Sequence, residues 1–402
     1  MGDAEQLILR VEPEIASIAA QDWDACANPS APEFREIEPY NPFISHAFLH
    51  ALEASGCVTA ETGWAPQHLV LDDGSGKVLG CTPCYLKGHS MGEYVFDYGW
   101  ADAYERAGGR YYPKLQSSVP FTPVTGRRLL VPPCADAERR EQFLVSGAVE
   151  LSNRHEVSSL HLTFLTTPEW ERMGEMGLLQ RTDQQFHWVN DGYSTFDDFL
   201  NSLTSRKRKT IRKERREAFG DGMEVEWVTG SDLTERHWDA FYEFYMDTGA
   251  RKWGSPYLNR RFFSLIGETM ADQLLLVLCQ RDGRFIAGAL NFIGGDTLFG
   301  RYWGCREDQR FLHFELCYYQ AIDYAIAHGL GRVEAGAQGP HKLSRGYLPQ
   351  ITLSAHYIAD PAFRRGVERF LSQERSYVEM ETQALGARAP YRCGGKLDPD
   401  DA

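Results

Sequence analysis

Short apolar runs separated by turn residues mark one stretch in each half of the chain, 68–100 and 274–305. Each stretch reads as a strand, a turn that contains glycine, a second strand and a third strand. Overlay of the two stretches matches two pairs of glycines, Gly76 with Gly283 and Gly99 with Gly304. The repeated order predicts two copies of one fold. The alternative is that two unrelated β-meanders with Asp-Gly turns look alike.

After each meander the apolar period changes from 2 to 3.6, which predicts helices near 101–107 and over 311–328. Further helices are expected at 137–154, 168–176 and 361–382, and further strands at 158–165, 184–189 and 351–358. This order indicates a mixed α/β fold, in which each half is a mostly antiparallel twisted sheet flanked by helices. The expected domains are 1–190 and 191–385, followed by a polar tail at 386–402.

Composition agrees with a globular chain, because hydrophobic residues make up 43% of it and charged residues 24%. The nine cysteines are scattered without framework spacing, and no basic start with an apolar stretch is visible at the N-terminus. We therefore expect a cytoplasmic protein without a membrane span. The net charge of -14 opposes loose binding to nucleic acid, so any such partner needs a local basic patch.

The first candidate site lies on the expected helix 311–328. Phe311, Glu315, Tyr318 and Ile322 follow helical spacing, which places Glu315 in an otherwise apolar stripe. A buried carboxylate often has a raised pKa that suits proton transfer. The alternative is a structural hydrogen bond to a tyrosine or an arginine.

Polar residues also alternate along the next expected strand, where Glu334 and Gln338 flank Gly336 on one face. Glycine between two polar side chains lets a ligand approach the backbone. The following loop contributes His341, Lys342 and Arg345, and such a group suits recognition of phosphate or carboxylate next to an amine. The alternative is a solvated loop that only carries charge.

Residues 206–216 contain eight basic side chains and one acidic side chain in a segment of helical character. Arg206, Lys209, Lys213 and Arg216 are the candidates for binding the phosphates of a donor substrate, either coenzyme A or RNA. The alternative is an exposed helix facing acidic surface elsewhere.

The first half offers a second candidate groove. Lys114 and Gln116 alternate with apolar residues, and Asp97 ends the preceding expected strand. Cys81 and Cys84 form a CxxC pair without a second pair, so no metal site is expected.

Four segments resemble the FemAB-like, peptidoglycan biosynthesis/recognition branch of the GNAT acyltransferase superfamily. They are YYPKLQSSVPFTPVTGRRLL, FDDFLNSLTSRKRKTIRKERR, FLHFELCYYQAIDYAI and VEAGAQGPHKLSRGYLPQITLSAHYI. The resemblance implies tandem GNAT-like domains, and better-known Fem relatives transfer amino acids from aminoacyl-tRNA to peptidoglycan-precursor amines.

The resemblance therefore implies an N-acyltransferase that moves an acyl or aminoacyl group from acyl-CoA or aminoacyl-tRNA to a small-molecule or peptide amine, with no bound cofactor. The alternative is a non-catalytic protein of this fold that binds a phosphate-bearing ligand or RNA. Glu315, His341 and Lys342 are the candidate catalytic residues. The candidate substrate contacts are Glu334, Gln338, Arg345, Tyr302, Tyr318, Asp97, Lys114 and Gln116.

Overall fold

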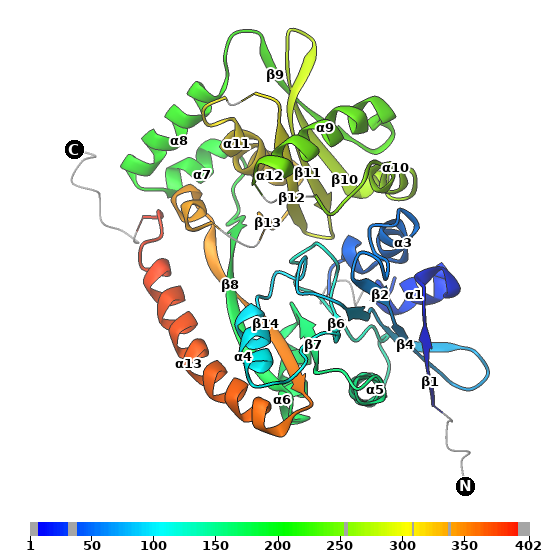
Figure 1. Ribbon diagram of the computed structural model, residues 1–402. Helices are drawn as coiled ribbons and strands as arrows, with labels where there is room; N and C mark the ends of the chain where they lie inside the picture. The colour runs from blue at the N-terminus through cyan, green and yellow to red at the C-terminus, as the bar shows by residue number, and fades with distance from the viewer. Residues whose placement is uncertain (1–6, 31–37, 253–255, 308, 337–338, 393–402) are drawn as a thin grey trace. The chain divides into compact units, whose positions relative to one another are not determined.

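The computed structural model describes the chain except residues 1–6, 31–37, 253–255, 308, 337–338 and 393–402 (Figure 1). The chain forms two compact units. Unit 1 combines Met1–Asp183 with Ile351–Glu379, and unit 2 combines Gln184–Gln350 with Met380–Ala402. These units differ from halves divided near residue 190, because the C-terminal segment Ile351–Glu379 packs with unit 1.

Unit 1 contains two sets of strands and several helices. Its small sheet has the order β1-β3-β4, and its share of the large sheet has the order β2-β5-β6-β7-β14. The strands are β1 (Ile8–Glu12), β2 (Trp64–Pro66), β3 (His68–Asp72), β4 (Val78–Thr82), β5 (Tyr85–Lys87), β6 (Lys114–Ser117), β7 (Ser159–Thr163) and β14 (Leu348–Ile358). The helices are α1 (Ala20–Ala27), α3 (His46–Ala54), α4 (Tyr98–Arg106), α5 (Ala137–Arg154), α6 (Thr167–Glu175) and α13 (Pro361–Gly386).

The strands of unit 2 have the order β8-β13-β12-β11-β10-β9. Its strands are β8 (Leu179–Val189), β9 (Met223–Thr229), β10 (Leu274–Arg281), β11 (Arg284–Ile293), β12 (Thr297–Cys305) and β13 (Arg332–Glu334). The helices are α7 (Phe196–Ser202), α8 (Ser205–Ala218), α9 (Glu235–Lys252), α10 (Arg260–Thr269), α11 (Leu312–Phe314) and α12 (Gln320–Ala327). The strands β8 and β14 and the helix α13 each begin in one unit and end in the other.

Each unit contains one parallel strand pair joined through a helix. In unit 1, β6 and β7 pair in parallel and α5 lies between them in sequence. In unit 2, β12 and β13 pair in parallel, with α11 and α12 between them in sequence. The other strand pairs within the two units run antiparallel where the structure gives their register, so the fold is mixed α/β as expected.

The expected match of Gly99 with Gly304 is wrong. Gly304 lies in β12, whereas Gly99 lies in the first turn of α4. The segment from 88 to 97 contains no strand. Because β6 forms the parallel pair of unit 1 with β7, the counterpart of β12 is β6, which lies further along the chain. The turn pair Gly76 and Gly283 holds, since both glycines have positive φ values between paired antiparallel strands.

The expected continuous helix 311–328 is interrupted by a π-helical turn over Glu315–Tyr319. Phe311, before the helix, has a left-handed φ of 64°. The extra residue in the turn breaks the 3.6-residue period on which the expected stripe depended. Leu316 and Tyr319 pack into the core of unit 2, which includes Leu275 and Val277 of β10.

No helix in the described part of the chain is long and apolar enough to cross a membrane.

Candidate functional site

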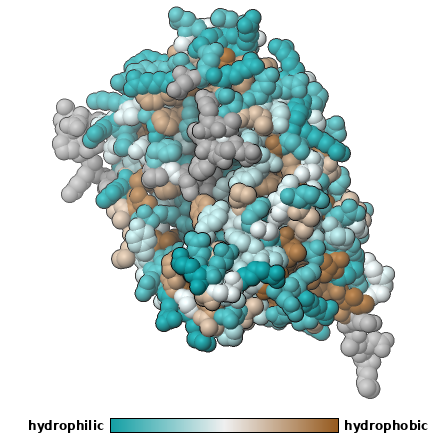
Figure 2. Space-filling model, in the orientation of Figure 1, coloured by the Kyte–Doolittle hydropathy of each residue, from teal (hydrophilic) through white to brown (hydrophobic). Residues whose placement is uncertain are grey.

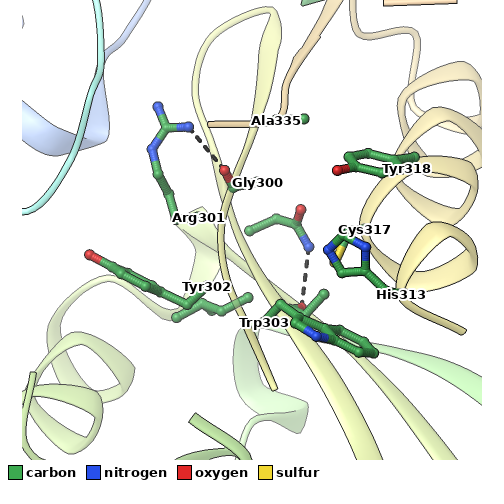
Figure 3. A pocket seen from close by; sticks show the side chains of 11 residues that line it. Gly300, Arg301, Tyr302, Trp303, His313, Cys317, Tyr318 and Ala335 are labelled. Carbon is green, nitrogen blue, oxygen red and sulfur yellow. Dashed lines mark hydrogen bonds between the residues drawn. The ribbon is translucent and has the colours of Figure 1, made fainter. Parts of the chain in front are cut away.

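The parallel strands β12 and β13 stay together for only three residue pairs. Thr297–Phe299 pairs with Arg332–Glu334, after which β13 ends while β12 continues to Cys305. A pocket of about 100 Å³ opens beside this end of the pair (Figure 3). Its lining residues come from β11, β12, the helix after β12, and the end of β13: Ala289, Leu290, Asn291, Gly300, Arg301, Tyr302, Trp303, His313, Cys317, Tyr318 and Ala335.

A β-bulge shapes the sheet side of this pocket. Leu290 pairs with Tyr302 and Asn291 pairs with Gly300, so Arg301 is an extra residue in β12. Bulges of this kind redirect side chains and are common beside functional sites. Figure 3 shows Gly300 and Arg301 on the strand side of the pocket, and His313, Cys317 and Tyr318 on the helix side.

The Tyr318 hydroxyl and the His341 ring form the best-defined polar pair at the pocket. Tyr318 Oη lies 3.0 Å from His341 Nε2. Burial raises the pKa of Tyr318, so its phenol stays protonated near neutral pH. Burial and the charges of Arg345 and Lys342 lower the pKa of His341, so its ring stays neutral and can accept a proton.

Lys342 lies under the segment that follows β13. Its side chain is buried, and Nζ donates hydrogen bonds to Ala335 O at 2.5 Å and Gly336 O at 3.0 Å. Burial lowers the pKa of Lys342 to about 7, and the nearby charge of Arg301 acts in the same direction. Lys342 therefore holds the backbone at one side of the pocket and carries a charge that changes near neutral pH.

Glu315 lies in a closed cluster and does not line the pocket. It is fully buried, and its carboxylate accepts hydrogen bonds from Arg215 at 2.9 and 3.2 Å and from Gln320 at 2.8 Å. Burial raises its pKa, although the Arg215 charge opposes that shift. Arg215 also bonds Asp323 at 2.6 Å, so the cluster joins α8, the π-helical turn and α12.

The other expected residues of unit 2 are dispersed around the pocket. Tyr302 lines it. Glu334 is buried with Arg301 Nη2 at 3.4 Å, and Arg345 is buried with Glu214 Oε1 at 2.8 Å. Gln338 lies outside the described residues.

The expected residues of unit 1 form a separate buried cluster. Lys114 Nζ lies 2.7 Å from Glu93 Oε2 and 2.5 Å from Asp97 Oδ2, and all three side chains are almost fully buried. Burial opposes the charge on Asp97, but the charges of Lys114 and His161 and the hydrogen bonds to that carboxyl together lower its pKa. Gln116 donates a hydrogen bond to Thr163 at 3.0 Å. The cluster is buried in unit 1 but is not fully hydrogen-bonded, because Glu93 Oε1, Asp97 Oδ1 and Gln116 Oε1 have no hydrogen-bond partner among the described residues.

The basic segment forms helix α8, as expected. Its buried face includes Ile211, Glu214 and Ala218. Its exposed face carries the expected cations Arg206, Lys209, Lys213 and Arg216. The surface over α8 is predominantly hydrophilic in Figure 2.

Several lining residues were missed from the sequence, among them Asn291, Gly300, His313 and Cys317. One signal was available. Asn291 is a polar residue in the otherwise apolar run ALNFI, at a position where a sheet core excludes an amide unless it is hydrogen-bonded.

Each of the two units thus contains a sheet segment with one parallel strand pair, which defines a mixed α/β protein of two units. The chain belongs to the FemAB_like family, described as peptidoglycan biosynthesis/recognition, whose model matches residues 14–393. No curated protein matches the sequence.

Comparison with solved structures gives matches at low identity. A crystal structure of FemX is 14% identical, with a TM-score of 0.53 over 87% of this chain and 98% of that chain. A tandem GNAT protein from the clavulanic acid biosynthesis pathway is 12% identical, with a TM-score of 0.48 over 89% of this chain and 99% of that chain. L-PGS from Bacillus licheniformis is 7% identical, with a TM-score of 0.46 over 90% and 98% of the two chains.

Proposed function

We propose that this protein is an N-acyltransferase that moves an acyl or aminoacyl group from an activated donor to an amine. The observation that carries the proposal is the pocket where β12 and β13 separate, because Tyr318 lines it and the Tyr318 hydroxyl contacts His341 Nε2. Membership of the FemAB_like family supports the same reaction class.

The pair supplies the proton transfer that acyl transfer requires. The amine nitrogen attacks the acyl carbonyl carbon, a C–N bond forms, and the bond from that carbon to the donor oxygen or sulfur breaks. Tyr318 accepts the proton from the attacking nitrogen and passes its own proton to His341 Nε2, 3.0 Å away. His341 then returns that proton through Tyr318 to the departing oxygen or sulfur. Lys342 acts as a positioning residue, because it fixes the carbonyl groups of Ala335 and Gly336.

The donor carries phosphates in this proposal, because the exposed cations of α8 suit them. Both acyl-CoA and aminoacyl-tRNA meet that requirement, and binding to either is expected to weaken with salt. Neither donor is a resident cofactor. The acceptor is a small molecule or a peptide with a free amine. The competing function is non-catalytic binding of RNA or another phosphate-bearing ligand, which the same helix supports.

A donor screen tests the reaction directly. The purified protein is incubated with acetyl-CoA or with a mixture of aminoacyl-tRNAs and with amine acceptors that include a peptidoglycan-precursor peptide. Mass spectrometry then follows acylation of the acceptor. We expect one donor class to support transfer, and we expect Tyr318→Phe to lower turnover by about 10²-fold, the usual scale for an acid-base group.

Tyr324→Phe is the matched control, because Tyr324 lies on α12 and does not line the pocket. It should retain wild-type turnover. Binding of tRNA or coenzyme A without any transfer would instead support the non-catalytic function. Equal turnover in Tyr318→Phe and wild type would remove Tyr318 from the mechanism.

A further inference from the structure

One side chain at the pocket has an unused hydrogen-bond acceptor. Asn291 is 1% exposed in β11, and its Nδ2 donates to Leu275 O and Ala289 O, each at 3.3 Å. Main-chain carbonyl groups only accept hydrogen bonds, so these two contacts fix which end of the amide is nitrogen. Oδ1 is left as a buried acceptor without a partner among the residues that the structure describes.

The register places this buried oxygen at the wall of the pocket. Gly300 lies opposite Asn291, and both residues line the pocket. A Cβ atom on Gly300 would lie 3.3 Å from Asn291 Oδ1 and 3.4 Å from Glu334 O. Gly300 is not among the glycines with positive φ, so space rather than backbone conformation accounts for the missing side chain.

The chemistry of the lining defines what Oδ1 can accept. An amide oxygen buried without a partner is unfavourable, and a ligand that donates an N–H or O–H removes that cost. The lining contains Arg301 but no aspartate or glutamate side chain. Arg301 already pairs with the buried carboxylate of Glu334, so an entering ammonium group would find no lining carboxylate to neutralise it. A neutral hydroxyl or amide N–H fits better.

The size of the pocket limits the ligand group. A cavity of about 150 Å³ can hold benzene, so a pocket of about 100 Å³ accommodates a group of only a few heavy atoms. The short acyl part of a donor is of that size.

We propose that Asn291 is a specificity-determining residue that accepts a hydrogen bond from a neutral hydroxyl or amide N–H on the small group entering this pocket. The proposal rests on the proposed function in placing that group on the acyl donor. It adds a preference for a polar acyl group over an apolar group of the same shape.

Matched donor analogues test the preference by binding alone. Coenzyme A thioesters and 3′-amino-3′-deoxyadenosine amides are each prepared with a lactyl or an isobutyryl group, which differ by a hydroxyl in place of a methyl. Isothermal titration should show the lactyl form binding at least about fivefold more tightly on the carrier that the protein accepts. The alanyl form, with its ammonium, should bind more weakly than the lactyl form.

Two independent variants connect the preference to the oxygen. Asn291→Leu removes the acceptor, and Gly300→Ala places a methyl against it, so either change should bring the lactyl-to-isobutyryl ratio to about one. Because the two substitutions lie on different strands, a folding defect in one leaves the other informative. Asn201→Leu, at an exposed position, is the control and should retain the wild-type ratio.

The outcomes separate the inference from the proposed function. Equal binding of the two forms by the wild-type protein, or no binding by any analogue, would overturn the inference. If Asn291→Leu also weakens binding of the unacylated carrier, the group that donates the hydrogen bond to Asn291 belongs to the carrier. Its assignment to the acyl group is then wrong. A lactyl preference without acyl transfer would contradict only the enzymatic function, whereas transfer without a preference would contradict only the role of Asn291.

Discussion

Lys342 couples the candidate site to pH. Burial lowers its pKa from 10.5 to about 7, so between these values the unfolded chain binds a proton that the folded chain has lost. The free energy of unfolding attributable to this residue consequently rises with pH across the window, by up to about 1.4 kcal/mol per pH unit.

Substitution Lys342→Met should remove this dependence. Between pH 7 and pH 9, urea unfolding should show wild-type stability increasing relative to the variant. Lys209→Met removes an exposed lysine and should follow wild type at both pH values. Parallel pH profiles for wild type and Lys342→Met would show that the buried amine keeps an ordinary pKa.

Single residues were the hardest feature to predict. A carboxylate in an apolar stripe drew attention to Glu315, which is indeed fully buried. Its partner Arg215 comes from a helix 100 residues earlier, so sequence spacing could not reveal the closed pair. Asn291 and Gly300 become neighbours only through the bulged register of β11 and β12. Burial could be predicted from pattern, but the partners that determine a residue's role required the fold.

At the scale of secondary-structure elements, Arg215 joins three helical segments through Glu315 and Asp323. Replacement by methionine would leave the carboxylate of Glu315 buried without its cation, which costs about 3 kcal/mol or more in comparable pairs. Chemical denaturation of Arg215→Met should show that loss. Arg212→Met is a matched control because Arg212 lies on the same helix with an exposed pairing to Asp197, and it should change stability by less than about 1 kcal/mol. Similar losses in both variants would contradict a special role for the Arg215 cluster.

Helix α8 yields a prediction about salt. Replacement of Arg206, Lys209, Lys213 and Arg216 by glutamine should weaken binding of the accepted donor and reduce the slope of log affinity against log salt, by up to about 0.7 to 0.9 for each phosphate that these cations neutralise. Titrations at several salt concentrations measure both effects. The control replaces four exposed arginines elsewhere by glutamine: Arg139, Arg365, Arg369 and Arg388. An unchanged slope in the α8 variant would give the basic face a structural or solubility role.

Secondary-structure elements were predicted well where periodicity was strong. The helices expected at 137–154 and 361–382 and the strand at 351–358 correspond to α5, α13 and most of β14. The third strand of the first meander failed, because the residues before Gly99 form irregular chain and then a helix. The π-helical turn was also missed, since one inserted residue changes the facing of side chains without changing the apolar composition from which the helix was predicted.

At the scale of the whole molecule, α13 completes unit 1. Val367 and Leu371 are buried with Trp100, Tyr111 and other residues of that unit in one apolar cluster. A chain that ends after residue 360 should thus expose this cluster, and calorimetry should show a lower Tm or the loss of one cooperative transition. The control chain ends at Arg392 and should melt like the full chain. An unchanged transition in the shorter chain would show that unit 1 is stable without α13.

Because residues 351–379 belong to unit 1, they also limit when unit 1 can fold during translation. By the time residue 183 has been synthesised, unit 1 still lacks β14 and most of α13, and unit 2 in turn takes its last segment from residues after 379. Folding during translation commonly proceeds domain by domain from the N-terminus. Unit 1 cannot fold completely before residues 351–379 have been synthesised, so its apolar cluster stays uncovered until then. We therefore expect chaperones to bind the nascent chain until residues 351–379 have been synthesised, and to bind it much less afterwards.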